Sequence, residues 1–321
     1  MAEKQFQVGG QAVIEGVMMR SQNAYSVAVR RQDGSILVRK KNYVSFVKRF
    51  KYLALPILRG AVVLIESLVL GVKALSFSGD VAMEDENASE GKKKTATKTG
   101  FLSKVWLAST VLFSFAVGLL IFFYLPLILT ELLGAESSFM FNFVDGIIRL
   151  GVFLLYLFLM TLMKDIRRVF EYHGAEHKSI FAFEQKKRLV PDEAALQSRF
   201  HPRCGTSFLL IVMVVSIFVF MFLGKPDTVG DRLFRMAFIP LIGGISYELI
   251  RLSHSGSQSR FWRPFIMPGL WLQRLTTKEP DTSQLEVALI ALKCALDMDV
   301  SQHSEVVFEN QKTEQLEEVQ S

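Results

Sequence analysis

Four long apolar segments constrain this chain more than any other feature of its sequence. They cover residues 105–130, 146–163, 206–223 and 233–250. A helix needs about 20 residues to cross the hydrocarbon core of a bilayer, and each segment reaches or approaches that length. Inside a membrane, only helices and closed barrels pair all of their backbone polar groups. We therefore predict a mainly α-helical integral membrane protein with about four transmembrane helices.

The composition indicates a membrane protein that also has polar domains. Of the 321 residues, 50% are hydrophobic and the mean hydropathy is +0.29, whereas 21% are charged, which is high for a bundle buried in lipid. Two cysteines are too few for a disulfide framework and favour a reducing compartment. Residues 1–20 lack the continuous apolar core of a signal peptide. The net charge of +6 fits contact with anionic membrane lipid, and no segment resembles a nucleic-acid-binding module, so we expect no nucleic-acid partner.

The distribution of Lys and Arg predicts how the chain is oriented in the membrane. Residues 1–60 contain eleven of them and residues 164–203 contain nine, whereas residues 131–145 contain none. Cytoplasmic loops carry the excess of positive charge. Four spans place both basic regions, and both termini, in the cytoplasm. A fifth span at residues 61–78 would move one basic region to the outside.

The N-terminal region, residues 1–55, is predicted to be a β-rich cytoplasmic element. Residues 24–31 and 36–40 alternate between apolar and polar side chains around an Asp-Gly turn, which is typical of a β-hairpin. Residues 9–20 form a further candidate strand, whose glycines allow bulges or close backbone contacts.

Residues 56–79 are predicted to form an amphipathic or re-entrant helix. Arg59, Glu66 and Lys73 recur every seven residues and therefore lie near one line of that helix. Three interpretations stay open. The helix lies on a surface with this line solvated, lines a functional cavity, or is a fifth span.

The remaining segments have distinct compositions. Residues 80–104 are predicted to be a polar linker, and residues 105–250 form the four-span membrane domain. Residues 251–300 place tryptophans and arginines together, as in a cytoplasmic interfacial segment, and end in a short amphipathic helix with Asp281 and Thr282 as candidate caps. Residues 301–321 are polar and Glu-rich and are predicted to be a disordered tail.

A metal-binding motif lies in the loop between the second and third predicted spans, residues 164–205. His173, Glu176 and His177 form a His-x-x-Glu-His unit, the inverted zincin arrangement. On a helix, the two histidines project from one face one turn apart, as two ligands of one metal ion require. The chain has only five histidines and two cysteines, yet His201 and Cys204 follow closely. We expect a divalent metal, with zinc as the leading candidate.

The third metal ligand is left open by the sequence. His201, Cys204, Glu184 and Glu248 are the candidates. If His201 and Cys204 both bind, four protein ligands fill a tetrahedral zinc site, which favours a structural role. If only three bind, water has a place and Glu176 is a candidate general base. A buried Cys204 that only packs, or acts as a nucleophile beside a histidine, is the remaining alternative.

Four separated segments resemble one known family. Residues 9–20, 171–178, 201–207 and 268–280 are similar, in order, to the bacterial YqhQ-type membrane protein family, a domain of unknown function described as a predicted metal-dependent enzyme. The likeness extends from about residue 7 to about residue 297. The resemblance implies a multi-pass protein of the bacterial cytoplasmic membrane.

Two functional hypotheses follow. In the first, the protein is a zinc-type metal-dependent membrane hydrolase at the cytoplasmic membrane face, with His173, His177, His201 and Cys204 as the metal-ligand candidates and Glu176 as the catalytic base. A peptide or a lipid headgroup suits that location as substrate, and membrane lipid and a membrane protein or peptide are the expected partners. In the second, the protein is a non-enzymatic membrane assembly or partner-binding factor with a structural metal site. The number of protein ligands discriminates between them.

Overall fold

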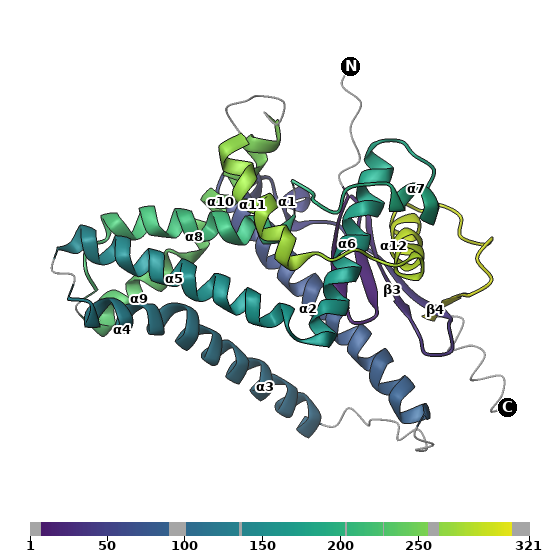
Figure 1. Ribbon diagram of the computed structural model, residues 1–321, viewed down its shortest axis with the longest axis horizontal. Helices are drawn as coiled ribbons and strands as arrows, with labels where there is room; N and C mark the ends of the chain where they lie inside the picture. Colours follow the sequence, from purple (N-terminus) through teal and green to yellow (C-terminus); the bar gives the residue numbers. More distant parts are fainter. Residues whose placement is uncertain are drawn as a thin grey trace.

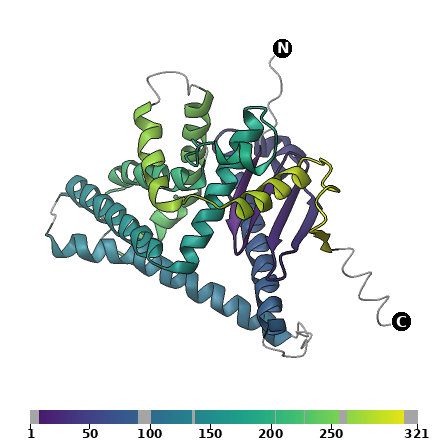
Figure 2. The same cartoon turned by 45° about the vertical axis from the view of Figure 1, so that its right-hand side comes forward.

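The computed structural model describes residues 8–89, 101–134, 137–202, 204–226, 228–255 and 263–309. It has two parts, a bundle of long apolar helices and an α/β module at one end of that bundle (Figure 1). The module contains a five-stranded sheet with helices on both faces, and it is built from the N-terminal, central and C-terminal parts of the chain (Figure 2). The fold is therefore mainly helical with a small sheet, as the sequence predicts.

The sheet has the strand order β1-β2-β3-β4-β5. Its strands are β1 (Gly9–Val13), β2 (Gly16–Arg20), β3 (Ala24–Arg30), β4 (Ile36–Asn42) and β5 (Val306–Phe308). The first four pair antiparallel in succession, whereas β5 is parallel to β4. The predicted hairpin is β3–β4, and Gly34 in its turn has φ 89°, the left-handed region that favours glycine. Residues 9–20, expected as one strand, form two strands joined at Ile14 and Glu15.

Three helices bury both faces of the sheet. They are α2 (Leu58–Ser89), α6 (Lys164–Glu184) and α12 (Thr282–Ala295). Successive side chains of a strand point to opposite faces. Val17 and Met19 accordingly pack in the core beneath α6 and α12, whereas Met18 and Val27 pack with α2. Strand β2 is therefore apolar at almost every position, because neither face meets water.

Helix α12 lies inside this module. Its predicted start is confirmed, because Asp281 caps it in a capping box with Gln284. Most of its side chains are buried, including every residue from Val287 to Leu292. A helix that is apolar around its circumference is buried on all sides, whereas an interfacial helix keeps a polar face. Helix α12 therefore differs from the amphipathic, interfacial helix that was expected in residues 251–300.

Two further boundaries differ from those expected. The predicted tail, residues 301–321, contains β5, which extends the sheet beside β4; residues 310–321 lie outside the described residues. Residues 80–89 of the predicted linker continue α2, and residues 90–100 lie outside the described residues. Asp85 explains the longer helix, since it accepts a hydrogen bond from Arg31 Nε at 2.8 Å and fixes the polar end of α2 to the sheet.

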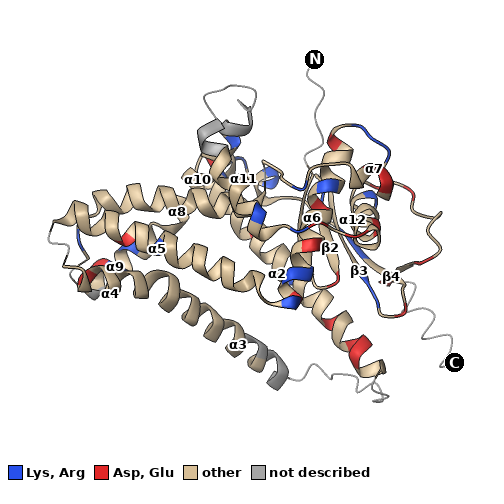
Figure 3. Cartoon of the chain, in the orientation of Figure 1, with Lys and Arg blue, Asp and Glu red and all other residues tan. Residues whose placement is uncertain are grey.

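The bundle contains the remaining long helices. Its elements are α3 (Phe101–Leu119), the π-helical turn η2 (Leu120–Tyr124), α4 (Leu125–Leu132), α5 (Ser138–Thr161), α8 (Gly205–Phe222), α9 (Val229–Ala237), α10 (Ile239–Ser255) and α11 (Arg263–Thr276). Five described segments are long and apolar enough to cross a membrane: Leu58–Ser89, Ser109–Leu132, Ser138–Thr161, Gly205–Phe222 and Gly230–Leu252. Four of them match the predicted spans, and the fifth is α2. Charged residues are sparse along this bundle and frequent on the module (Figure 3).

Helix α2 joins the two parts of the molecule. Near its start, a Cβ on Gly60 would lie 2.9 Å from the Gly244 Cα, so glycines allow α2 and α10 to touch. Arg59 Nη2 lies 2.6 Å from Glu248 Oε2, which adds an ion pair to that contact. Glu66 is buried and accepts a hydrogen bond from Ser45 Oγ at 2.8 Å. Two of the three residues on the predicted polar line therefore bind protein groups, so the line is not simply solvated.

A buried polar cluster closes the end of the bundle opposite the module. Asp145 and Arg149 on α5 form an ion pair at 2.7 Å. Arg235 on α9 donates a hydrogen bond to Asn142 Oδ1 at 2.7 Å. Buried charges are costly unless they are paired, and Asp145 and Arg149 pair within α5. The hydrogen bond from Arg235 to Asn142 joins α9 to α5.

Candidate metal centre

Helix α6 positions the His-x-x-Glu-His unit. The helix packs on β1, β2 and α12, which buries Tyr172, Ala175 and Ile180 in the core of the module. The prediction that this stretch is helical is confirmed. His173 and His177 lie one turn apart with ring centroids at 4.5 Å, on the side of α6 that faces the loop from α7 (Pro191–Ala195) to α8.

Cys204 completes a group of three ligand atoms. It is the N-cap residue of α8, and its Sγ lies 3.2 Å from His173 Nε2. The ligand atoms of His173, His177 and Cys204 all lie within 4.8 Å of one another, which is close enough for one metal ion. Two imidazoles and a thiolate are a donor set that suits zinc.

Backbone carbonyls select the nitrogen that each histidine offers. His173 Nδ1 lies 2.7 Å from the Thr276 carbonyl oxygen, and His177 Nδ1 lies 2.5 Å from that of Arg199. A carbonyl only accepts, so Nδ1 carries the proton and the Nε2 lone pair is left for a ligand. His177 Nε2 is buried and has no hydrogen-bond partner in the described part of the chain. This orphaned nitrogen fits a metal ligand, and outer carbonyls of this kind commonly orient such histidines.

Burial favours the neutral form of the His177 ring. His177 is 1% exposed, and this desolvation lowers its pKa, although the neighbouring Cys204 thiol opposes the change. Only a neutral imidazole coordinates a metal ion. The protein environment therefore keeps His177 in the form that binds.

Glu176 lies beside the ligand group without belonging to it. Its Oε2 is 3.8 Å from His173 Nε2, and its side chain is buried. Desolvation raises the pKa of Glu176, while His173, His201 and the Gly10 backbone oppose that shift. A Cβ on Gly10 would lie 2.8 Å from Glu176 Cγ, so the glycine of β1 leaves room for this carboxylate.

The other candidate ligands lie outside the group. His201 is close, with its ring centroid 5.7 Å from that of His177, but its Nε2 faces Glu184 Oε2 at 3.4 Å. Burial lowers the pKa of His201 to about 4. Glu248 is paired with Arg59 at the α2–α10 contact. The sequence proposes His173, His177, His201 and Cys204 as ligands, and the structure brings together His173, His177 and Cys204.

Sequence reasoning missed the residues that position Cys204. Gln273 on α11 is fully buried, its Oε1 accepts from the His201 backbone N–H at 2.7 Å, and its Nε2 donates to the His201 carbonyl at 2.7 Å. The same Nε2 donates to Ser207 Oγ at 2.9 Å. One amide therefore clamps the loop on both sides of Cys204. The sequence offers little signal for this role, since Gln273 lies next to Arg274 and shortly before two threonines and a lysine.

The chain is similar to known proteins over a stretch that includes the residues of this centre. Residues 55–298 match the family described as "Protein of unknown function (DUF1385)". The chain is 37% identical over 295 residues to the "Uncharacterized protein YqhQ" of Bacillus subtilis (strain 168), which covers 88% of this chain and 89% of that protein. No solved structure matches the chain. The family match includes α6, the Cys204 loop and Gln273, and the chain belongs to the DUF1385 family.

Proposed function

We propose that this protein is a metal-dependent hydrolase whose divalent ion, zinc by its donor set, is held by His173, His177 and Cys204. The observation that carries the proposal is the meeting of these three ligand atoms beside the buried, non-ligating carboxylate of Glu176. Three protein ligands leave one position of a tetrahedral site for water or substrate. When bound, the ion supplies a Lewis acid that makes water more acidic.

The residues of the chain have separable roles in this proposal. The carbonyls of Thr276 and Arg199 orient the two imidazoles, and Gln273 holds the loop that carries Cys204. Glu176 accepts a proton from water as general base. Its place next to His173 Nε2 puts the carboxylate within one water molecule of the ligand group.

A structural metal site in a non-enzymatic membrane factor is the second candidate. The proximity of His201 to His177 favours it, because a change of side-chain conformation would bring a fourth ligand toward the group. A filled site of three histidines and one cysteine would leave no position for water.

Replacing Glu176 with glutamine separates these candidates. In a hydrolase, Glu176→Gln keeps the metal and the fold, because the amide has the same shape, but it cannot accept a proton, so function falls by at least about 100-fold. The measurement is complementation of a deletion strain at native expression level, with metal content determined on the purified variant. Full complementation would remove the hydrolase proposal. Loss of metal together with function would instead assign Glu176 to orienting a ligand histidine.

We infer a topology of four spans in a bacterial cytoplasmic membrane, with both termini and the metal centre cytoplasmic. The packing of α2 supports this count. Its residues Leu70, Ala74, Phe77 and Val81 lie in the core beneath the sheet, so this half of the helix belongs to the module. The 12 residues from Leu58 to Val69 span about 18 Å as a helix, which is too short for a hydrocarbon core of about 30 Å.

Cysteine labelling tests this topology. A cysteine at Lys186, in the basic loop after α6, should resist a membrane-impermeant maleimide in intact cells and react after permeabilisation. A cysteine at Leu133, at the opposite end of the bundle, should react in intact cells. The reverse pattern contradicts the inferred orientation and moves the metal centre out of the cytoplasm.

A further inference from the structure

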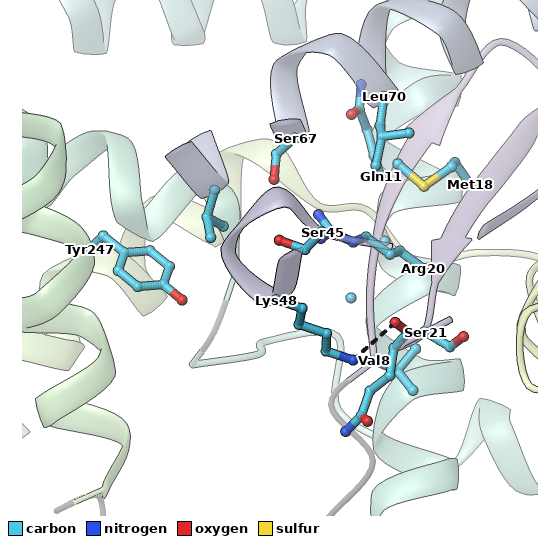
Figure 4. A pocket seen from close by; sticks show the side chains of 14 residues that line it. Val8, Gln11, Met18, Arg20, Ser21, Ser45, Lys48, Ser67, Leu70 and Tyr247 are labelled. Carbon is cyan, nitrogen blue, oxygen red and sulfur yellow. Dashed lines mark hydrogen bonds between the residues drawn. The ribbon is translucent and has the colours of Figure 1, made fainter. Parts of the chain in front are cut away.

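A cavity lies where the module meets the bundle, next to the metal centre. It has a volume of about 360 Å³, within the range of small-molecule sites. The edge of the sheet at β1 and β2, helix α2, the short helix α1 (Phe46–Arg49) and Tyr247 of α10 surround it. Arg20, Ser45 and Lys48 gather on one side of it and Tyr247 lies across from them (Figure 4).

The cavity and the metal centre share a wall at Gly10. Gly10 lines the cavity, and the side chain of Glu176 packs against the same glycine. Because residue 10 has no side chain, only backbone atoms stand at this position between the cavity and the carboxylate. A molecule bound here is therefore next to the proposed general base.

The polar lining of the cavity suits an anion. Hydroxyl groups of Ser21, Ser45 and Ser67 line it together with the cationic side chains of Arg20 and Lys48. Arg20 is partly neutralised by Glu66, at 3.5 Å. Lys48 Nζ donates to the Gln22 carbonyl at 3.3 Å and, among the described residues, has no carboxylate partner. A lysine balanced only by a neutral carbonyl leaves net positive charge at the cavity.

The segment at the mouth of the cavity has the composition of a membrane interface. Phe46, Phe50, Tyr52 and Leu55 in and around α1 and η1 (Lys51–Ala54) are about half or more exposed. They alternate with basic residues, which are Lys48, Arg49 and Lys51. Exposed aromatic and aliphatic side chains beside lysine and arginine insert at the headgroup level of an anionic leaflet. The segment that lines the cavity therefore has the composition that suits contact with anionic lipid.

We propose that this cavity binds the anionic headgroup of a membrane lipid from the cytoplasmic leaflet, with Lys48 and Ser67 contacting the phosphate and the acyl chains lying along the exposed segment of α1 and η1. The role of that lipid as a substrate rests on the proposed hydrolase function, whereas binding of the lipid in the cavity does not depend on that function.

Binding is measured on the purified full-length chain in a neutral detergent. The probe is a fluorescent short-chain phosphatidylglycerol, compared with phosphatidylcholine of the same chain length and with inorganic phosphate as competitor. We expect phosphatidylglycerol to bind at least tenfold more tightly than phosphatidylcholine. Lys48→Glu, which reverses the charge, and Ser67→Trp, which fills the cavity, should each weaken binding at least tenfold.

Two matched variants act as controls. Lys73→Glu makes the same charge change at an exposed position of α2 outside both the cavity lining and the α1–η1 segment, and Leu68→Trp places the same bulk at a neighbouring exposed site. Both should bind within about twofold of the wild type. Equal weakening by Lys48→Glu and Lys73→Glu would show that the lipid responds only to the overall charge of the protein, and would overturn the site. Competition by inorganic phosphate at the concentrations at which the lipid binds would overturn the assignment to lipid.

Metal content of the same samples keeps the two proposals apart. A protein that holds its metal but does not bind the probe refutes the lipid site and leaves the hydrolase standing. A protein that binds the probe at the cavity but never holds a metal retains the lipid site and refutes the hydrolase.

Discussion

Gly174→Ala is expected to empty the metal centre and destabilise the protein by about 2–3 kcal/mol. A Cβ at this position would overlap the Lys278 carbonyl oxygen, and that segment is held because Lys278 N donates to the Phe170 carbonyl at 2.8 Å. Backbone must therefore move to admit one methyl group. The displaced segment includes Thr276, whose carbonyl orients His173.

Helix propensity alone predicts that Gly174→Ala would stabilise the protein. Alanine within a helix is more stable than glycine by about 1 kcal/mol, so a harmless Gly174→Ala would raise the melting temperature. Gly79→Ala on α2 is the matched control, since a Cβ there meets no atom within 4 Å. We expect Gly79→Ala to keep full metal content and an unchanged or higher melting temperature. Wild-type metal content and stability in Gly174→Ala would contradict the close contact between α6 and residue 278.

Local signals in the sequence were sufficient where neighbours in the chain decide the structure. The β3–β4 hairpin is specified by its Asp-Gly turn, and the start of α12 by the Asp281 cap. The spacing of His173 and His177 places both rings on one face of α6 once that stretch is helical. These features are contained within about one turn or one hairpin.

Contacts between distant segments set the features that the sequence did not predict. Strand β5 forms because residues 306–308 pair with the edge of β4, some 270 residues away, whereas residues 301–321 taken as a whole have the composition of a polar tail. The long helix α2 is apolar enough for a membrane span, yet half of that apolar surface is used beneath the sheet. Hydropathy measures the need for burial and does not specify whether lipid or protein provides it.

The choice among metal ligands also depended on tertiary packing. His201 and Cys204 are only three residues apart, so spacing favours neither. Gln273, some 70 residues further along, pairs with the backbone of His201, and Cys204 then begins α8 with its thiol toward His173. The ring of His201 instead faces Glu184.

Metal content of the purified full-length protein tests the central claim most directly. We predict about one zinc ion per chain in the wild type, and at least tenfold less in Cys204→Ser and in a His173→Ala, His177→Ala double variant, because each change removes ligands from a three-ligand site. His201→Ala and Cys294→Ser, the matched controls, should keep the ion, since neither residue belongs to the group. Stoichiometric metal in the double-histidine variant would contradict the claim that these residues form the metal centre.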